Sequence, residues 1–272
     1  MAFAAYCASR GWLVRFWIPH DTRLSRTAAG ERVIPTNLDS SHTTRLRADD
    51  TAMGTLFLFR HGETDLSAGH YCGATDPPLN EHGRRQAAGV RDYLRGQSVA
   101  AIYASPMRRA VETAEPAADA LGLETCTIPA LREVDFGEWE GRGLDEVRER
   151  YPELWQRRQE DPFSVTPPGG ERYSDLAARV LPAFDELIAD HQEDAIVVVA
   201  HMSVNRIFLA HVLHMPMEYL RRIGQDTAAL SLIALDGERI EILTMNERCH
   251  LAGPASDPTR RSADAAGLPI EQ

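Results

Sequence analysis

Short hydrophobic runs along this chain alternate with longer stretches in which apolar residues recur at helical spacing. The runs have the length and composition of buried β-strands. Residues 195–200 (Ala-Ile-Val-Val-Val-Ala) are almost purely apolar, as expected of a central parallel strand that is covered on both faces. The predicted strands cover residues 55–59, 100–104, 123–128 and 195–200.

Helix-start and helix-stop residues lie between these runs. Asn80 predicts the N-cap of a helix that continues to Arg95. Ser105 with Pro106 predicts the start of a second helix, which Gly122 would end. Two more helices are expected: one with apolar positions across residues 176–188 and a kink at Pro182, and one from about Ser203 to His214.

Near the C-terminus, Asp236-Gly237 separates apolar segments at 228–235 and 239–245, which is a hairpin pattern. The preceding elements alternate strand and helix, which is typical of a parallel sheet. The sequence therefore predicts an α/β fold: a three-layer sandwich with a mostly parallel central sheet, helices on both faces and a C-terminal β-hairpin.

The chain divides into three segments by pattern and charge. Residues 1–52 show no sustained period and hold seven arginines against five acidic residues, whereas residues 53–272 hold 22 against 35. We expect 1–52 to be a poorly ordered or spurious N-terminal extension, since it also lacks the form of a signal peptide. Residues 53–251 form the predicted domain, and 252–272 a flexible tail.

Composition excludes several function classes. The net charge of −11 argues against nucleic-acid binding, which needs a basic field. No apolar run approaches the roughly 20 residues that span a membrane. The four cysteines are scattered without a CxxC pair, which favours reduced thiols over disulfides or zinc. We expect a cytoplasmic monomer or homodimer.

Candidate catalytic groups follow the predicted strands. Arg60 and His61 leave the first strand, arginines follow Ser105 after the second, and His201 follows the strand 195–200. The loop after residue 131 adds carboxylates. Because ligands bind at the carboxyl ends of parallel strands, these side chains should converge. Two arginines, two histidines and a carboxylic acid would suit phosphoryl transfer.

Other notable residues have structural interpretations. Arg108, Arg221 and Arg222 are expected on solvated helices, and Trp139 in packing. His211 and His214 raise a metal site, but core or surface positions are preferred because their spacing matches no metal motif. We therefore expect no metal and no cofactor.

Across about residues 55–250, the order of these motifs resembles the histidine phosphatase superfamily, whose members are phosphoglycerate-mutase-like. The resemblance implies that His61 is the phosphorylated nucleophile and Glu133 the proton donor. It implies that Arg60, Arg109 and His201 bind the phosphoryl group, His201 also being catalytic. The family spacing selects Arg109 over Arg108, and Glu133 over Asp135 and Glu138.

The segments 135–141, 167–171 and 246–250 look most like small bacterial phosphatases, particularly the α-ribazole phosphatase type. The resemblance implies substrate contacts at Ser67, Cys72 and Gly73. The chain departs from the family at Ser67 and His70, where asparagine and arginine are common, and at 202–203, where Met-Ser replaces glycines. The first departures bear on substrate identity.

The sequence thus predicts a metal-independent phosphomonoesterase that uses a phosphohistidine and acts on a small phosphorylated metabolite such as α-ribazole phosphate or a sugar phosphate. A 2,3-bisphosphoglycerate-dependent phosphoglycerate mutase is the first alternative. The short stretch between Gly137 and Pro167 favours hydrolysis, because a mutase needs a longer cover to exclude water. A catalytically silent binding protein is the second alternative.

Overall fold

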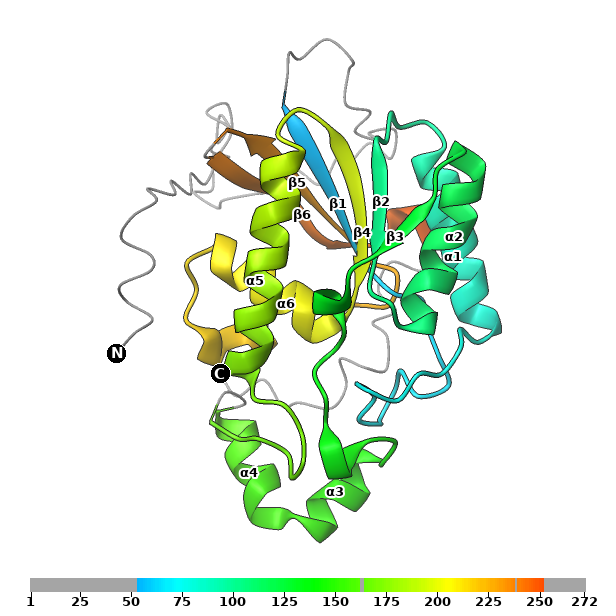
Figure 1. Cartoon of the computed structure of the whole chain (residues 1–272). Helices are drawn as coiled ribbons and strands as arrows, with labels where there is room; N and C mark the ends of the chain where they lie inside the picture. Colours follow the sequence, from blue (N-terminus) through cyan, green and yellow to red (C-terminus); the bar gives the residue numbers. More distant parts are fainter. Residues whose placement is uncertain (1–52, 162–163, 238, 252–272) are drawn as a thin grey trace, which may run out of the picture.

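The computed structural model describes residues 53–161, 164–237 and 239–251 (Figure 1). The predicted N-terminal extension (1–52) and C-terminal tail (252–272) lie outside the described residues. The described part has one central sheet with helices against both of its faces, which confirms the predicted α/β sandwich.

The sheet has six strands in the order β3-β2-β4-β1-β5-β6. Strands β1, β4, β2 and β3 are mutually parallel, while β5 is antiparallel to both β1 and β6. The predicted C-terminal hairpin is therefore confirmed. The strands are β1 (Gly54–Arg60), β2 (Ala101–Ala104), β3 (Thr125–Thr127), β4 (Ala195–Ala200), β5 (Leu230–Asp236) and β6 (Arg239–Glu247).

Alternate residues of the central strands bury opposite faces of the sheet. Leu56 and Leu58 of β1 belong to one hydrophobic cluster, and Phe57 and Phe59 belong to the other. Since both sets are buried, β1 reads as a continuous apolar run instead of an alternating pattern. This is why the strand was predictable from sequence.

Each sheet face is covered by a pair of long helices. Helices α1 (Glu81–Leu94) and α2 (Arg108–Leu121) pack on one face, and α5 (Tyr173–Asp190) and α6 (Met202–Val212) on the other (Figure 1). The Asn80 side chain accepts from the backbone N–H of Gly83, as its predicted N-cap role requires.

Two helices that sequence reasoning missed lie in the connection from β3 to α5. Helices α3 (Leu144–Arg150) and α4 (Pro152–Glu160) project beyond the carboxyl edge of the sheet (Figure 1). Their sequences are short and rich in charge, so neither shows a sustained apolar stripe. Short 3-10 turns complete the chain: η2 (Pro129–Leu131), η3 (Gly137–Trp139), η4 (Met217–Arg222) and η5 (Cys249–Leu251).

One predicted helix start is wrong. Helix α2 begins at Arg108, not at Ser105, because its first backbone N–H is capped by Asp76 from a distant loop at 2.8 Å. Helix α6 begins at Met202, one residue before the predicted start near Ser203, with His201 at its N-cap. Helix α5 continues through Pro182 from residue 173 to residue 190.

Candidate active site

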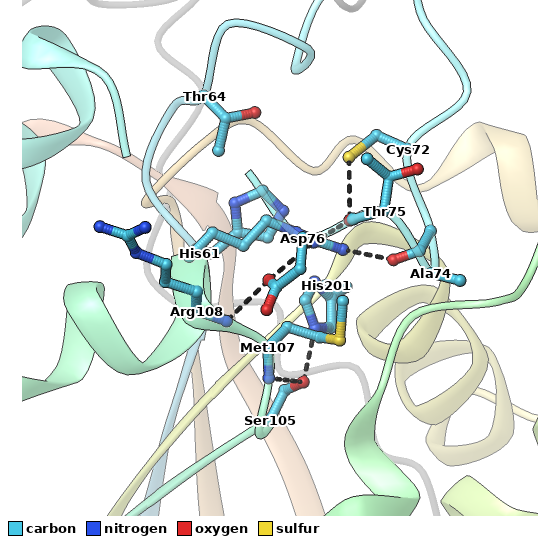
Figure 2. Close-up of polar contacts among 12 residues, drawn as sticks. His61, Thr64, Cys72, Ala74, Thr75, Asp76, Ser105, Met107, Arg108 and His201 are labelled. Carbon is cyan, nitrogen blue, oxygen red and sulfur yellow. Dashed lines mark hydrogen bonds and ion pairs between the residues drawn. The ribbon is translucent and has the colours of Figure 1, made fainter. Parts of the chain in front are cut away.

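The parallel pairing of β1 with β4 brings the two candidate histidines together. The backbone N–H of His61, just beyond β1, donates to the carbonyl of Ala200 at the end of β4 at 2.9 Å. The next residue is His201, and the two imidazole rings lie 5.1 Å apart between centroids. Figure 2 shows both rings, with the Ser105 hydroxyl bonded to His201.

One ring nitrogen of His61 makes a hydrogen bond to the neighbouring backbone. Its Nδ1 lies 2.7 Å from the carbonyl oxygen of Gly62, which can only accept, so Nδ1 carries the proton. Nε2 then has the lone pair of a neutral imidazole. Burial, followed by the positive charges of Arg109 and Arg60, holds the pKa of His61 well below 6.5. The ring is therefore neutral at physiological pH.

His201 is fully buried next to His61. Its Nε2 lies 2.7 Å from the Ser105 hydroxyl, and its Nδ1 has no hydrogen-bond partner among the described residues. Burial and the neighbouring Arg109, His61 and Arg60 lower its pKa well below 6.5. If the neutral ring carries its proton on Nδ1, an anionic oxygen that binds there would accept this otherwise unpaired N–H.

Arg109 is the most deeply buried charge of the site, with 0% of its surface exposed. Its Nη1 and Nη2 donate to the carbonyls of Thr75 and Gly73 at 2.8 and 2.9 Å, and its Nε has no partner among the described residues. A Cβ on Gly73 would meet the Val134 carbonyl at 1.8 Å, so only glycine fits there. The loop at 72–76 thereby fixes the guanidinium.

Glu140 holds that loop. Its carboxylate accepts hydrogen bonds from the backbone N–H groups of Gly73, Ala74, Thr75 and Phe136 and from the Thr75 hydroxyl, at 2.7 to 3.1 Å. These bonds lower its pKa against the opposing effect of burial. Sequence reasoning missed this role because the donors at residues 73–75 lie more than sixty residues earlier in the chain.

Glu133 is a buried carboxylate of the site, with 7% of its surface exposed. Its Oε1 accepts from the N–H of Val134 at 2.9 Å, and its Oε2 from the N–H of Ser203 at 3.1 Å. The alternative acids are engaged elsewhere, since Asp135 accepts from Gly137 and Glu138 from the Tyr151 hydroxyl.

A cavity of about 240 Å3 opens beside these groups and is lined by Arg60, His61 and Glu133. Ser67 and Cys72 also line this cavity, whereas Gly73 contributes its carbonyl to Arg109 instead. Burial raises the pKa of the Cys72 thiol, which is therefore not a thiolate nucleophile.

Sequence reasoning also missed several cationic residues of this cavity. Arg158 of α4, Arg206 of α6 and Arg221 of η4 line it. The prediction that Arg221 lies on a solvated helix is wrong, because this half-buried residue faces the cavity. Arg222 is exposed as predicted.

The predicted positions of Arg108 and Trp139 are confirmed. Arg108 is exposed and pairs with Glu112 at 2.6 Å, and Trp139 is fully buried. Within the described part of the chain, no three His, Cys, Asp or Glu side chains gather as a metal site would require. Among these same residues, no helix has both the length and the apolar character needed to cross a bilayer.

The chain matches the family model of the histidine phosphatase superfamily (branch 1) over residues 56–248. It is 40% identical over 179 residues to a bifunctional protein of Mycobacterium tuberculosis, covering 65% of this chain and 49% of that protein. The chain thus spans about half the length of the first curated relatives it matches.

Two further relatives are matched over nearly their whole length. Phosphoserine phosphatase 1 of Hydrogenobacter thermophilus is 34% identical, with 72% of this chain and 93% of the relative covered. The structure of the α-ribazole phosphatase of Shigella flexneri superposes with a TM-score of 0.66 at 27% identity, covering 71% and 96% of the two chains.

Glu140→Gln should weaken the binding of a phosphate oxygen by Arg109. The amide replaces one acceptor oxygen with an NH2 group that faces backbone N–H donors, which should cost about 1.5–3 kcal/mol of folding stability. We expect a Kd for inorganic phosphate raised several-fold in calorimetry. Glu138→Gln, a neighbouring exposed carboxylate, is the control, and equal phosphate affinity of both variants would contradict the role of Glu140.

The depressed histidine pKa values predict a pH-dependent stability. The unfolded chain protonates near pH 6.5, whereas folded His61 and His201 stay neutral, so the unfolding free energy should fall as pH drops below about 6.5. Urea unfolding at pH 7.5 and 5.5, without phosphate, measures this. His61→Gln/His201→Gln should lose part of the difference; an unchanged slope would contradict the assignment.

Proposed function

This chain belongs to the histidine phosphatase superfamily, and from that premise we propose that it is a phosphoric monoester hydrolase that works through a phosphohistidine at His61. The observation that carries the proposal is the hydrogen bond from His61 Nδ1 to the Gly62 carbonyl at 2.7 Å. It leaves Nε2 with a lone pair beside Arg60 and Arg109, which supply charge for a phosphoryl group.

In the first step, the Nε2 lone pair of His61 attacks phosphorus. The N–P bond forms as the ester P–O bond breaks, and the leaving oxygen takes its proton from the Glu133 carboxylic acid. Arg60, Arg109 and Nδ1–H of His201 donate to the equatorial oxygens, over which the charge of the transferring phosphoryl group is spread in the transition state.

In the second step, water attacks phosphorus and gives its proton to the Glu133 carboxylate. The P–N electron pair returns to Nε2, so phosphate leaves and both His61 and Glu133 regain their starting forms. Water or a second hydroxyl can accept the phosphoryl group from the same intermediate, and this choice separates a phosphatase from a mutase.

Hydrolysis is supported by the relatives, whose names are those of phosphatases for phosphoserine and α-ribazole phosphate. The substrate we propose is a small phosphorylated metabolite of this kind. The two arginines supply the positive charge at the phosphoryl group, so we propose a metal-independent reaction. A cytoplasmic location and a monomeric or homodimeric state stay predictions of the sequence.

His61→Ala should reduce phosphate release from monoesters to the background rate, because the nucleophile is removed. Incubation with a 32P-labelled monoester, followed by a denaturing quench at alkaline pH, should label wild-type protein with an alkali-stable, acid-labile bond. His82→Ala removes an exposed histidine of α1 and is the control. Equal labelling of His61→Ala and wild type would refute the proposal, and isomerisation of 3-phosphoglycerate without phosphate release would favour the mutase.

Glu133→Gln should slow alkyl phosphates about 10²–10⁴-fold, the usual contribution of a general acid. p-Nitrophenyl phosphate should lose much less, since its leaving group needs little protonation. Steady-state kcat on both substrates measures the difference, with Glu138→Gln as the control carboxylate. Equal losses on the two substrates would remove Glu133 from the proton-donor role.

A further inference from the structure

A second group of arginines lines the same cavity as His61 and Arg60. Arg158 comes from α4, Arg206 from α6 and Arg221 from η4, and all three line the cavity together with His61. Helix α4 lies beyond the carboxyl edge of the sheet (Figure 1). The cavity is thus lined both by groups at the carboxyl end of the sheet and by a cationic wall that consists of Arg158, Arg206 and Arg221.

Arg158 is the most enclosed of the three, with 4% of its surface exposed. The rings of Tyr71, Phe136, Trp139 and Tyr173 surround its guanidinium at 5.2 to 5.8 Å. Its Nη2 donates to the Tyr173 hydroxyl at 3.2 Å, but its buried Nη1 has no hydrogen-bond partner among the described residues. Aromatic packing therefore fixes a planar donor fork whose Nη1 lacks an acceptor among the described residues.

The other two arginines are anchored by neutral groups. Nε of Arg206 donates to the Ile223 carbonyl at 2.8 Å, and Nη1 of Arg221 donates to the Gln159 side chain at 2.8 Å. Burial lowers the pKa of Arg206 to about 10, and both burial and the charge of Arg158 lower the pKa of Arg221. These cations remain protonated at neutral pH and repel each other.

No protein carboxylate neutralises this wall in the described residues. None of the three arginines has an ion pair within 4.0 Å there, and Glu133 is the only acidic residue that lines this cavity. Burying a cation without a counterion costs free energy. The chain has a net charge of −11, so acidic residues outnumber basic ones, yet none of them pairs with these three arginines among the described residues. An anionic ligand would relieve both the desolvation and the repulsion.

We propose that Arg158, Arg206 and Arg221 form a subsite for a second anionic group of the substrate, a carboxylate or a phosphate. This rests on the proposed function, in which Arg60 and Arg109 bind the phosphoryl group that is transferred. Those two charges already match a phosphate monoester dianion, so the additional arginines need a further anion. The substrate is thus a compact phosphomonoester with a second negative charge.

The wild-type enzyme tests the substrate class directly. O-Phosphoserine and O-phosphoethanolamine differ by one carboxylate, and 1,3-propanediol bisphosphate and its monophosphate differ by one phosphate. We expect kcat/KM to be at least about tenfold higher for the member of one pair that carries the second anionic group, as expected for one charge-assisted contact. The pair that shows the preference identifies the second group. Ratios within twofold for both pairs would overturn the proposal.

Substitutions then locate the subsite. Arg158→Lys and Arg221→Gln should lower kcat/KM for the preferred substrate about 10–100-fold, mostly by raising KM. For the paired substrate that lacks the second anion, kcat/KM should fall much less. Arg157→Gln and Arg222→Gln change exposed neighbours on the same elements and should keep the wild-type preference. A preference that survives in Arg158→Lys and Arg221→Gln would overturn the assignment.

The controls separate this proposal from the proposed function. His61-dependent hydrolysis of p-nitrophenyl phosphate without a second-anion preference would overturn the subsite and leave the phosphatase intact. Absence of phosphate release from every monoester, including the two pairs, would overturn the phosphatase itself.

Discussion

The pairing of β1 with β4 is the constraint on which the rest of the site depends. It places the residue after each strand at the same sheet edge, so His61 and His201 face each other with 5.1 Å between their rings. Two adjacent imidazoles beside two guanidinium groups can only stay neutral, because burial and like charge both oppose protonation. The architecture of the sheet thereby sets the protonation state that nucleophilic attack requires.

The sequence was sufficient for the parts of this arrangement that are local. Apolar runs located the strands, and the residues immediately after them supplied His61 and His201. It was insufficient where a distant segment decides the local structure. Helix α2 starts at Arg108 because Asp76, about thirty residues earlier, caps it, and this left Ser105 to bind His201. No local pattern around Ser105 distinguishes a helix cap from a histidine partner.

The cavity wall was the least predictable part for the same reason. Helix α4 is short and strongly polar, so Arg158 reads as one more solvated charge between Arg157 and Glu160. Its burial is created by four rings from three other parts of the chain, at Tyr71, at residues 136–139 and at Tyr173. A guanidinium can occupy such a site because its planar faces stack on aromatic rings while its edge still donates.

The two ends of the cavity hold their arginine side chains in different ways. At the phosphoryl end, Arg109 donates through Nη1 and Nη2 to backbone carbonyls of a loop that the Glu140 carboxylate holds in place, so the guanidinium is positioned before any ligand arrives. At the far end, Arg158 has a fixed plane but an unsatisfied edge. The first arrangement suits a group that is common to every substrate, since its geometry never changes. The second suits recognition, because only a ligand with the matching anion completes its hydrogen bonds, and a ligand without one leaves a buried donor unpaired.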